Sequence, residues 1–399
     1  MRAMLHAESR SIAVIGAGPV GLALALQASR ALPTAQVTVF DARPADKDVA
    51  ADPRTLALSL GSVQMLQRLG AWRADLAQPI LEVHVSQQPP SAGALLGAWF
   101  GEPEVRIRAI DEAVPMLGAV LSYGAIVAPL QEAWMRAAQA EPMRLHSRFG
   151  APVAALKARP GGVEVDAGIA EHFDLAVAAE GGVFADQARK AVSHDYHQTA
   201  WVGRVQIDGG SPGVAYERFT RHGPAALLPL KEGDAALVWC VNSDDDPVLG
   251  LDDAQRVAVL GSIFHPAVGR LRSVSPLKRF ALGMNAERSL TEGRTVRIGN
   301  AAQTLHPVAG QGLNLGLRDA HELVRGLAGH ANIDAALRRL EWQRAPDRWA
   351  MIAATDFLAR SFTWVLPGAA TARGLGLAAL QALPPVKAWL ARRMMFGGR

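Results

Sequence analysis

Cysteine is nearly absent from this sequence. Its 399 residues include one cysteine, Cys240, which excludes an internal disulfide and a cysteine-rich zinc or iron–sulfur site. Such a chain is typical of a reducing compartment. His194 and His197 form an H-x-x-H pair, but no third ligand has suitable spacing, so we expect no bound metal. Half of the residues are hydrophobic and 20% are charged, as in a globular protein of two to three domains.

Acidic residues are missing from the end of the chain. Residues 357–399 carry six cations and no acid, which leaves the first 356 residues at −2 of the total of +4. A basic tail on a nearly neutral body argues against a broad nucleic-acid surface. An anionic surface or an anionic partner for the tail stays open.

Charge is also missing from the 19 residues 11–29. A stretch of this length invites comparison with a signal peptide or a membrane helix. Three glycines and a proline interrupt it at fixed spacing, however, and no small-residue cleavage site follows. We therefore expect an element of a soluble fold and no targeting segment.

Residues 11–40 read as a strand, a G-x-G-x-x-G turn, a helix and a second strand, which Asp41 ends. In such a turn Gly16 permits the tight bend, Gly18 lets a pyrophosphate approach the backbone, and Gly21 lets helix and strand pack closely. The helix N-terminus attracts the phosphate charge, and Asp41 would accept hydrogen bonds from a ribose. The pattern predicts dinucleotide binding without separating FAD from NAD. The alternative is a glycine-rich turn of structural use only.

A second glycine motif follows a predicted strand at residues 295–298. Its first residues stand at the carboxyl end of that strand, where ligands of α/β sheets bind. A tight loop then leads into a predicted helix at residues 313–326, whose N-terminus would stabilise negative charge, such as the anion of a reduced flavin. The residues expected to contact a cofactor here are Gly299, Asn300, Gly310, Gly312, Leu313 and Asn314.

Together these motifs resemble the class A flavoprotein aromatic hydroxylases, and within them the ubiquinone-biosynthesis branch. The resemblance is carried by residues 299–319, including asparagine at position 300 where most relatives have aspartate, and by the blocks at 52–59 and 216–224. It extends over residues 11–396, nearly the whole chain.

The resemblance assigns two more residues to the cofactor and also reveals a departure. Arg54 is expected to reach the flavin or the diphosphate as a fixed cation, because a guanidinium can bind phosphate oxygens in a fork; the alternative is an exposed arginine in a loop. Family members usually carry Ala-Asp-Gly near the ribose, whereas this chain has Glu180-Gly181-Gly182. Glu180 keeps the charge and moves it one methylene further out.

The fold class implied is α/β, similar to para-hydroxybenzoate hydroxylase. It consists of a Rossmann-like FAD-binding domain, an inserted β-rich substrate domain and a helical C-terminal tail. We expect a discontinuous FAD-binding domain at residues 1–80, 105–185 and 290–335. We expect the substrate domain at 81–104 and 186–289, and the C-terminal helical region at 336–399.

The activity implied is that of an FAD-dependent aromatic monooxygenase of ubiquinone biosynthesis. In the family, NAD(P)H reduces FAD, reduced FAD and O2 form a C4a-hydroperoxide, and a bound phenol attacks its distal oxygen. Here the phenol would be a polyprenylated methoxyphenol. Two alternatives stay open. One is a non-catalytic FAD-binding scaffold of a quinone-biosynthesis complex, and the other is a related flavin hydroxylase acting on another phenol.

The catalytic residues are candidates only. The reaction needs no protein nucleophile, and no nucleophile motif is present. His306 and Pro307 are expected in the loop over the reactive face of the flavin, although His306 also suits a packing role at the start of a loop. Tyr216, His306 and Asp195 are the candidates for a base that deprotonates the phenol.

The basic tail has features of an interfacial helix. Its uncharged stretches, 361–372 and 374–386, span 12 and 13 residues, fewer than the ~20 needed to cross a bilayer. We expect a cytoplasmic protein whose tail contacts the inner face of the membrane or a lipid carrier, with other quinone-biosynthesis proteins as further partners. The alternative is that its apolar stripe packs on the core or on a second subunit. The stripe consists of Val386, Trp389, Leu390 and Met394.

Overall fold

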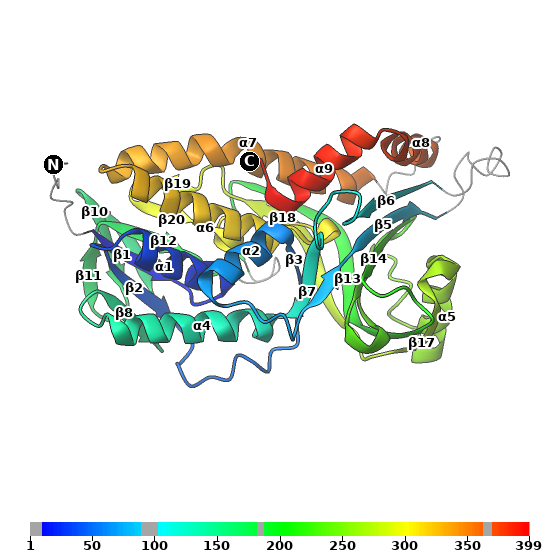
Figure 1. The fold of residues 1–399 in the computed structure, drawn as a ribbon, viewed down its shortest axis with the longest axis horizontal. Helices are drawn as coiled ribbons and strands as arrows, with labels where there is room; N and C mark the ends of the chain where they lie inside the picture. The colour runs from blue at the N-terminus through cyan, green and yellow to red at the C-terminus, as the bar shows by residue number, and fades with distance from the viewer. Residues whose placement is uncertain (1–9, 89–102, 182–186, 362–368, 399) are drawn as a thin grey trace.

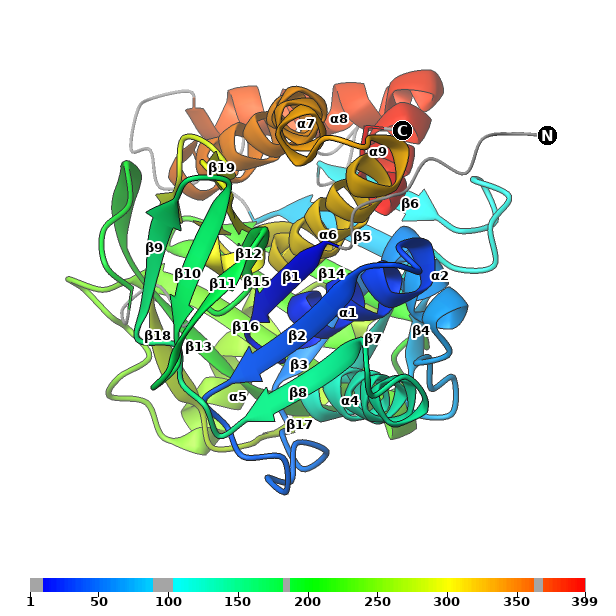
Figure 2. The same cartoon turned by 90° about the vertical axis from the view of Figure 1, so that its left-hand side faces the viewer.

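A six-stranded sheet forms the cofactor part of the molecule. The structure, a computed structural model, describes residues 10–88, 103–181, 187–361 and 369–398. The sheet has the order β19-β20-β12-β1-β2-β8, parallel except at β19 (Figure 2). Its central strands are buried apolar runs, as expected where both faces of a parallel sheet are covered. The strands are β1 (Ser11–Ile15), β2 (Gln36–Asp41), β8 (Leu145–Phe149), β12 (Leu175–Ala178), β19 (Thr291–Glu292) and β20 (Thr295–Arg297).

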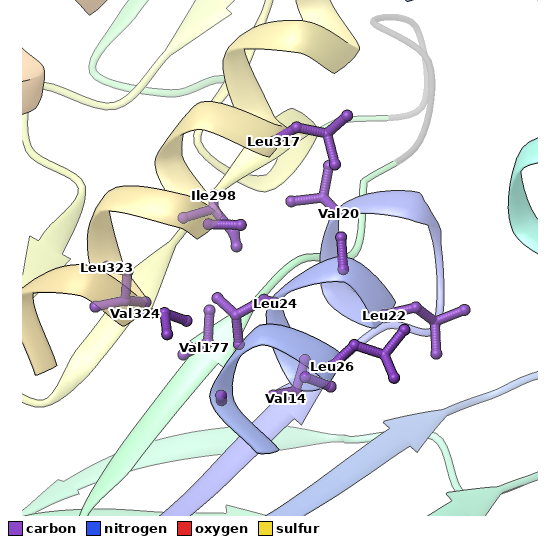
Figure 3. Packing of buried hydrophobic residues seen from close by; sticks show 14 of the residues in the cluster. Val14, Val20, Leu22, Leu24, Leu26, Val177, Ile298, Leu317, Leu323 and Val324 are labelled. Carbon is purple, nitrogen blue, oxygen red and sulfur yellow. The ribbon is translucent and has the colours of Figure 1, made fainter. Parts of the chain in front are cut away.

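Helices cover one face of this sheet, and a small antiparallel sheet covers the other. Buried side chains of the first helix pack between the parallel strands and a helix from much later in the chain (Figure 3). The later helix can pack this closely only because Gly316 has no side chain. A Cβ on Gly316 would lie 2.8 Å from the Cα of Gly299, which follows the last parallel strand. The helices are α1 (Pro19–Ala31), α4 (Tyr123–Ala140) and α6 (Gly312–Gly329), and the small sheet is β9 (Ala155–Arg159), β10 (Gly162–Asp166) and β11 (Ala170–Phe173).

Two helices differ in their ends from what the sequence predicts. The sequence pattern predicts a helix over residues 60–72, but α2 (Leu60–Leu69) ends three residues earlier because Gly70, at φ +69°, closes it in the left-handed conformation. It also predicts a helix over residues 127–140, but α4 begins four residues earlier because the Ser122 hydroxyl accepts a hydrogen bond from the Ala125 amide and so caps it.

A nine-stranded sheet forms the second part of the molecule. The long strand β13 lies near its middle and pairs with three others, and β5 and β6 add to its far edge. The sequence predicts residues 105–108 in the cofactor part. They lie in this sheet instead, because β6 pairs with β5. The strands are β5 (Glu82–Gln87), β6 (Glu104–Arg108), β13 (Val192–Asp208), β14 (Val214–Thr220), β15 (Gly223–Pro229), β16 (Asp234–Asn242), β17 (Arg270–Val274), β18 (Lys278–Ala286) and β21 (Gln303–Thr304).

Two smaller elements complete this half. Helix α5 (Asp253–Ile263) packs on the face of the large sheet that lies away from α7. A three-stranded sheet links the two parts and consists of β3 (Thr55–Ser59), β4 (Gln78–Ile80) and β7 (Gly118–Ser122).

Three helices at the end of the chain join the two parts. Helix α7 (Ile333–Ser361) packs against α6 and then runs along the upper edge of the molecule to the large sheet (Figure 1). Helix α8 (Ala369–Ala382) packs on β6, and α9 (Pro384–Phe396) packs on α2. Within the described ranges, no helix has the length and apolar character needed to cross a membrane.

A buried ionic network fixes α6 to α7. The Arg344 guanidinium donates to Asp319 and to Asp347, each at 2.7 Å, and all three side chains are nearly inaccessible to solvent. Gln303 donates to the second oxygen of Asp319 at 3.0 Å. Such a network requires every buried charge to keep its partner.

Candidate functional site

The G-x-G-x-x-G turn uses its three glycines for two different purposes. A Cβ on Gly21 would lie 1.9 Å from the carbonyl oxygen of Gly16, and a Cβ on Gly16 would lie 2.7 Å from Cγ of Glu180. The first and third glycines are therefore required by packing. A Cβ on Gly18 would meet nothing closer than the Tyr123 hydroxyl at 3.5 Å. The fold leaves space at Gly18, as a backbone that receives a diphosphate requires.

A pocket of about 290 Å³ opens beside this turn. Three cations line it, Arg43, Lys47 and Arg54, and suit a diphosphate. Asp41 lies in the same pocket, where its carboxylate accepts the backbone N–H of Ala17 at 2.5 Å and that of Arg43 at 2.7 Å. These bonds hold Asp41 at the end of β2, the position that the sequence predicts for binding a ribose.

Arg54 is held against the wall of this pocket. Its guanidinium pairs with Asp52 at 2.7 Å and lies 4.2 Å from the centre of the Tyr123 ring. The hydrogen bond from Arg54 lowers the pKa of Asp52, and burial raises the pKa of Tyr123. The pair and the ring together orient the cation, while the Arg54 side chain stays 60% exposed. Its contact with a cofactor stays a prediction.

Glu180 brings the first cofactor motif into contact with the second. The Cγ atom of Glu180 would lie 2.7 Å from a Cβ on Gly16 of the first motif. The next residue, Gly181, packs against Asn300 of the second motif, since a Cβ on Gly181 would lie 2.3 Å from the Cβ of Asn300. Burial raises the pKa of Glu180, and the nearby charge of Asp41 adds to the effect. Two carboxyl groups therefore share the carboxyl edge of the cofactor sheet, where the ribose of a dinucleotide binds in this class of fold.

The position of Glu180 gives a test of the departure from Ala-Asp-Gly. If the longer side chain binds the ribose, Glu180→Asp should leave the dissociation constant for FAD within about tenfold of wild type, about 1.4 kcal/mol. Titration of FAD into both proteins measures this ratio. A clearly tighter complex with Glu180→Asp would show that the glutamate impairs the site.

The second glycine motif is shaped by two left-handed glycines, Gly299 at φ +60° and Gly310 at φ +58°. Helix α6 begins directly after the second, at Gly312, and no side chain caps its first turn. The amide N–H groups there, including that of Leu313, are the kind of donors that an anionic ring edge accepts.

Asn314 has a structural role that the sequence does not reveal. Its side chain is buried, donates to the carbonyl oxygens of Ala57 and Gly310, and accepts bonds from the Ser59 amide and the Ser62 hydroxyl. These bonds tie the cofactor loop to β3 and α2. The backbone amide of Asn314, and not its side chain, is therefore suited to the cofactor.

His306 anchors the same loop. Its Nδ1 accepts the Val308 amide at 3.2 Å, which places the ring proton on Nε2, where it is donated to Gln198 at 3.0 Å. Burial lowers the pKa of His306 to about 3. A neutral imidazole with both nitrogens engaged is poorly suited to act as a general base. Pro307, the next residue, contributes to a second cavity.

This second cavity, of about 500 Å³, lies between the large sheet and the C-terminal helices. Pro307, Gln311 and Asn314 mark the end next to the start of α6. Side chains of α8 and α9 also line it, and α9 lies beside α6, where Arg318 donates to the carbonyl oxygen of Met394 at 2.7 Å. Most of the lining is apolar and includes Val85, Phe219, Val308, Leu358, Leu380 and Met394.

Of the other candidate bases, Tyr216 contributes to the lining of this cavity but bonds its hydroxyl elsewhere, and Asp195 does not line it. The Tyr216 hydroxyl donates to the carbonyl oxygen of Ala267 at 3.1 Å, on the α5 side of the sheet. Asp195 is exposed on β13 and lies 3.8 Å from Arg189. Our sequence-based prediction named Tyr216 and overlooked its neighbour Glu217, which lines the cavity. The alternation of side chains along β14 indicates that Tyr216 and Glu217 lie on different faces, because successive side chains of a strand point to opposite faces.

Comparison with known proteins identifies similar chains over the full length. The profile described as "FAD binding domain" matches residues 135–355. The chain is 30% identical over 412 residues to ubiquinone hydroxylase UbiL of Rhodospirillum rubrum, covering 96% of this chain and 89% of that protein. It is 28% identical over 393 residues to 3-demethoxyubiquinol 3-hydroxylase of Escherichia coli, covering 94% and 95%.

Solved structures share the fold at lower identity. HpxO of Klebsiella pneumoniae, complexed with FAD and uric acid, aligns with a TM-score of 0.72 at 17% identity, over 98% of this chain and 97% of that one. The p-nitrophenol 4-monooxygenase PnpA of Pseudomonas putida aligns with a TM-score of 0.71 at 15% identity, over 98% and 99%.

Proposed function

Because this chain belongs to the family of FAD-dependent aromatic hydroxylases that includes the ubiquinone-biosynthesis monooxygenases, we propose that it hydroxylates a 2-polyprenyl-6-methoxyphenol para to the ring hydroxyl. The large cavity carries the proposal. Its lining is largely apolar and combines the cofactor loop, the large sheet and side chains of α8 and α9. A phenol with a long prenyl chain is likewise largely apolar, with one polar end.

The residues present fit FAD, the cofactor of the family. The space at Gly18 and the three cations beside it suit the diphosphate, and the uncapped start of α6 suits the ring system. When bound, FAD accepts reducing equivalents, typically from NAD(P)H, and activates O2. The residues proposed to hold it are Gly16, Gly18, Gly21, Asp41, Arg54, Glu180, Gly299, Asn300, Gly310, Gly312, Leu313 and Asn314.

The protein itself would supply orientation and exclusion of water. Phe219, Val308 and Leu358 pack together where the large sheet, the cofactor loop and α7 meet. These apolar side chains would exclude water from the site and so limit side reactions of activated oxygen. His306 holds the loop in position through its bonds to Val308 and Gln198.

The test is turnover of the purified protein. FAD-loaded enzyme is reduced anaerobically with NADPH and then mixed with O2, with and without a 2-polyprenyl-6-methoxyphenol. We expect the para-hydroxylated hydroquinone only when the phenol is present, and accumulation of the phenol in cells that lack the protein. Accumulation of a later, methylated quinone precursor would assign another hydroxylation of the pathway. Flavin binding without product from any phenol would favour the scaffold.

We also propose that α8 and α9 contact an anionic lipid surface, from which the insoluble substrate enters. The interior side of α9 is in the core through Ala391 and Met395, whereas Leu383 and Val386 are 51% and 47% exposed. Of the expected stripe, Trp389, Leu390 and Met394 line the cavity and Val386 is exposed, so the stripe is divided between cavity wall and surface. Lys387, Arg392 and Arg393 add positive charge, each worth about 1 kcal/mol near an anionic membrane.

The double variant Leu383→Ser, Val386→Ser tests this contact without disturbing the core. We expect it to weaken flotation with anionic liposomes by about tenfold, because two partly buried apolar side chains would be lost from the lipid. The matched control is Ile169→Ser, Leu249→Ser, which removes two exposed apolar side chains elsewhere. Equal flotation of both variants would contradict a contact through α9.

A further inference from the structure

Strand β14 sorts its side chains between two environments. Ala215 packs in the apolar cluster that borders the cavity, and Phe219 packs with Val308. The residue between them in the alternation is Glu217, which lines the cavity as well. Tyr216 also contributes to the cavity lining, but the polar atoms of Tyr216 and Arg218 lie on the other face, since they bond to the carbonyl oxygens of Ala267 and Ile263 on the α5 side. A carboxyl group is therefore built into an otherwise apolar wall.

The immediate neighbours of Glu217 in the sheet are small or apolar. Its register partners are Ala226 on β15 and Val85 on β5, and both line the cavity. Cys240 on β16 is also near: burial raises the pKa of its thiol, and the negative charge of Glu217 adds to the effect. Both cross-strand register partners of Glu217 are therefore uncharged.

The other charged side chains of the cavity belong to the helices. Among the described residues that line it, these are Asp347, which is bonded to Arg344 at 2.7 Å, and Arg393, which lies 5.4 Å from the ring of Trp389. On the sheet face of the cavity, Glu217 is the charged group.

A phenol in such a cavity needs an acceptor for its O–H group, since burying a hydroxyl without a partner is costly. A carboxylate has about four acceptor sites, so bonds to protein donors still leave room for a ligand. Hydrogen bonds to a charged acceptor are also roughly twice as strong as neutral ones.

From this placement we propose that the Glu217 carboxylate accepts a hydrogen bond from the phenolic hydroxyl of the substrate, and so orients the ring and selects free phenols over their methyl ethers. The bond also draws the hydroxyl proton toward the carboxylate, which enriches the para carbon in electrons. This inference rests on the proposed function and names the group of the site that recognises the substrate.

The experiment compares binding of a short-chain 2-prenyl-6-methoxyphenol with binding of its O-methyl ether, measured by calorimetry on FAD-loaded protein. For wild type we expect the phenol to bind about ten- to hundredfold more tightly, as for a bond to a charged group. Glu217→Gln should reduce this preference by about tenfold, and Glu217→Asp should retain part of it. The matched control, Glu164→Gln on β10 in the small sheet of the cofactor part, should leave it unchanged.

The outcomes separate this inference from the proposed function. A preference that is the same in wild type and Glu217→Gln, with both proteins folded and hydroxylating the phenol, would overturn the role of Glu217 alone. If wild type produces no hydroquinone from the phenol, the proposed function fails, and the binding ratio still reports on Glu217. A raised KM for the phenol with unchanged KM for NADPH would support the inference in turnover.

Discussion

Replacing Gly18 with valine should abolish FAD binding while the protein stays folded. The backbone at Gly18 has φ −81° and ψ −176°, an extended conformation that any residue adopts. A Cβ there would point into space, with the Tyr123 hydroxyl at 3.5 Å as its nearest neighbour. The side chain would therefore occupy the position needed by the diphosphate. We expect a loss of at least about a hundredfold in FAD affinity, measured by titration of the flavin.

The neighbouring glycines should respond differently. Valine at Gly21 or Gly16 would collide with the Gly16 carbonyl or with Glu180, so these variants should lose stability as well as flavin. Gly261→Ala, at an open position in α5, is the control for the substitution itself. Full flavin uptake by Gly18→Val would exclude this turn as the diphosphate site, and tight NAD binding without flavin would exclude FAD as its ligand.

The second large effect is expected at Asp319. This carboxylate is fully buried and bonds to Arg344 and Gln303. Asp319→Asn removes the charge and leaves the Arg344 guanidinium, itself 5% exposed, without its main counter-ion. Breaking a buried pair in this way costs about 3–5 kcal/mol. Urea denaturation followed by far-UV circular dichroism should show a loss of this size in the free energy of unfolding.

An exposed pair on helix α4 is the control. Arg136 lies 3.8 Å from Glu132, and the two side chains are 66% and 68% exposed. Arg136→Gln should cost less than about 1 kcal/mol, as surface pairs do. If Asp319→Asn costs no more than Arg136→Gln, the network does not stabilise the junction of α6 and α7.

The sequence predicts the cofactor part well because its signals are local. Gly16, Gly18, Gly21 and Asp41 belong to one continuous βαβ unit, so their spacing alone implies their geometry. The loop from Gly299 to Asn314 is similarly continuous. The parallel order of the strands, with β12 beside β1 and β20 beside β12, then follows from the usual right-handed crossovers.

The substrate part was harder to predict because its contacts are distant in sequence. His306 is bonded to Gln198, 108 residues away, so its neutral, anchoring role is invisible in the motif around it. Alternation distinguishes Tyr216 from Glu217, but which face of β14 borders a cavity depends on where α5 and the C-terminal helices pack. The position of the tail stripe likewise depends on how α9 packs, since its buried residues, Ala391 and Met395, lie outside the predicted stripe.

The closure of the cavity by α8 and α9 has a consequence for biosynthesis of the chain. The cofactor sheet takes strands from residue 11 to residue 297, so the ribosome must complete most of the chain before that sheet can close. The apolar wall on the large sheet then remains uncovered until α9 emerges. At about 5–20 residues per second this interval is short, but a chain terminated before residue 384 would expose the wall permanently. Premature stop codons near the 3′ end of the reading frame should therefore yield aggregated protein.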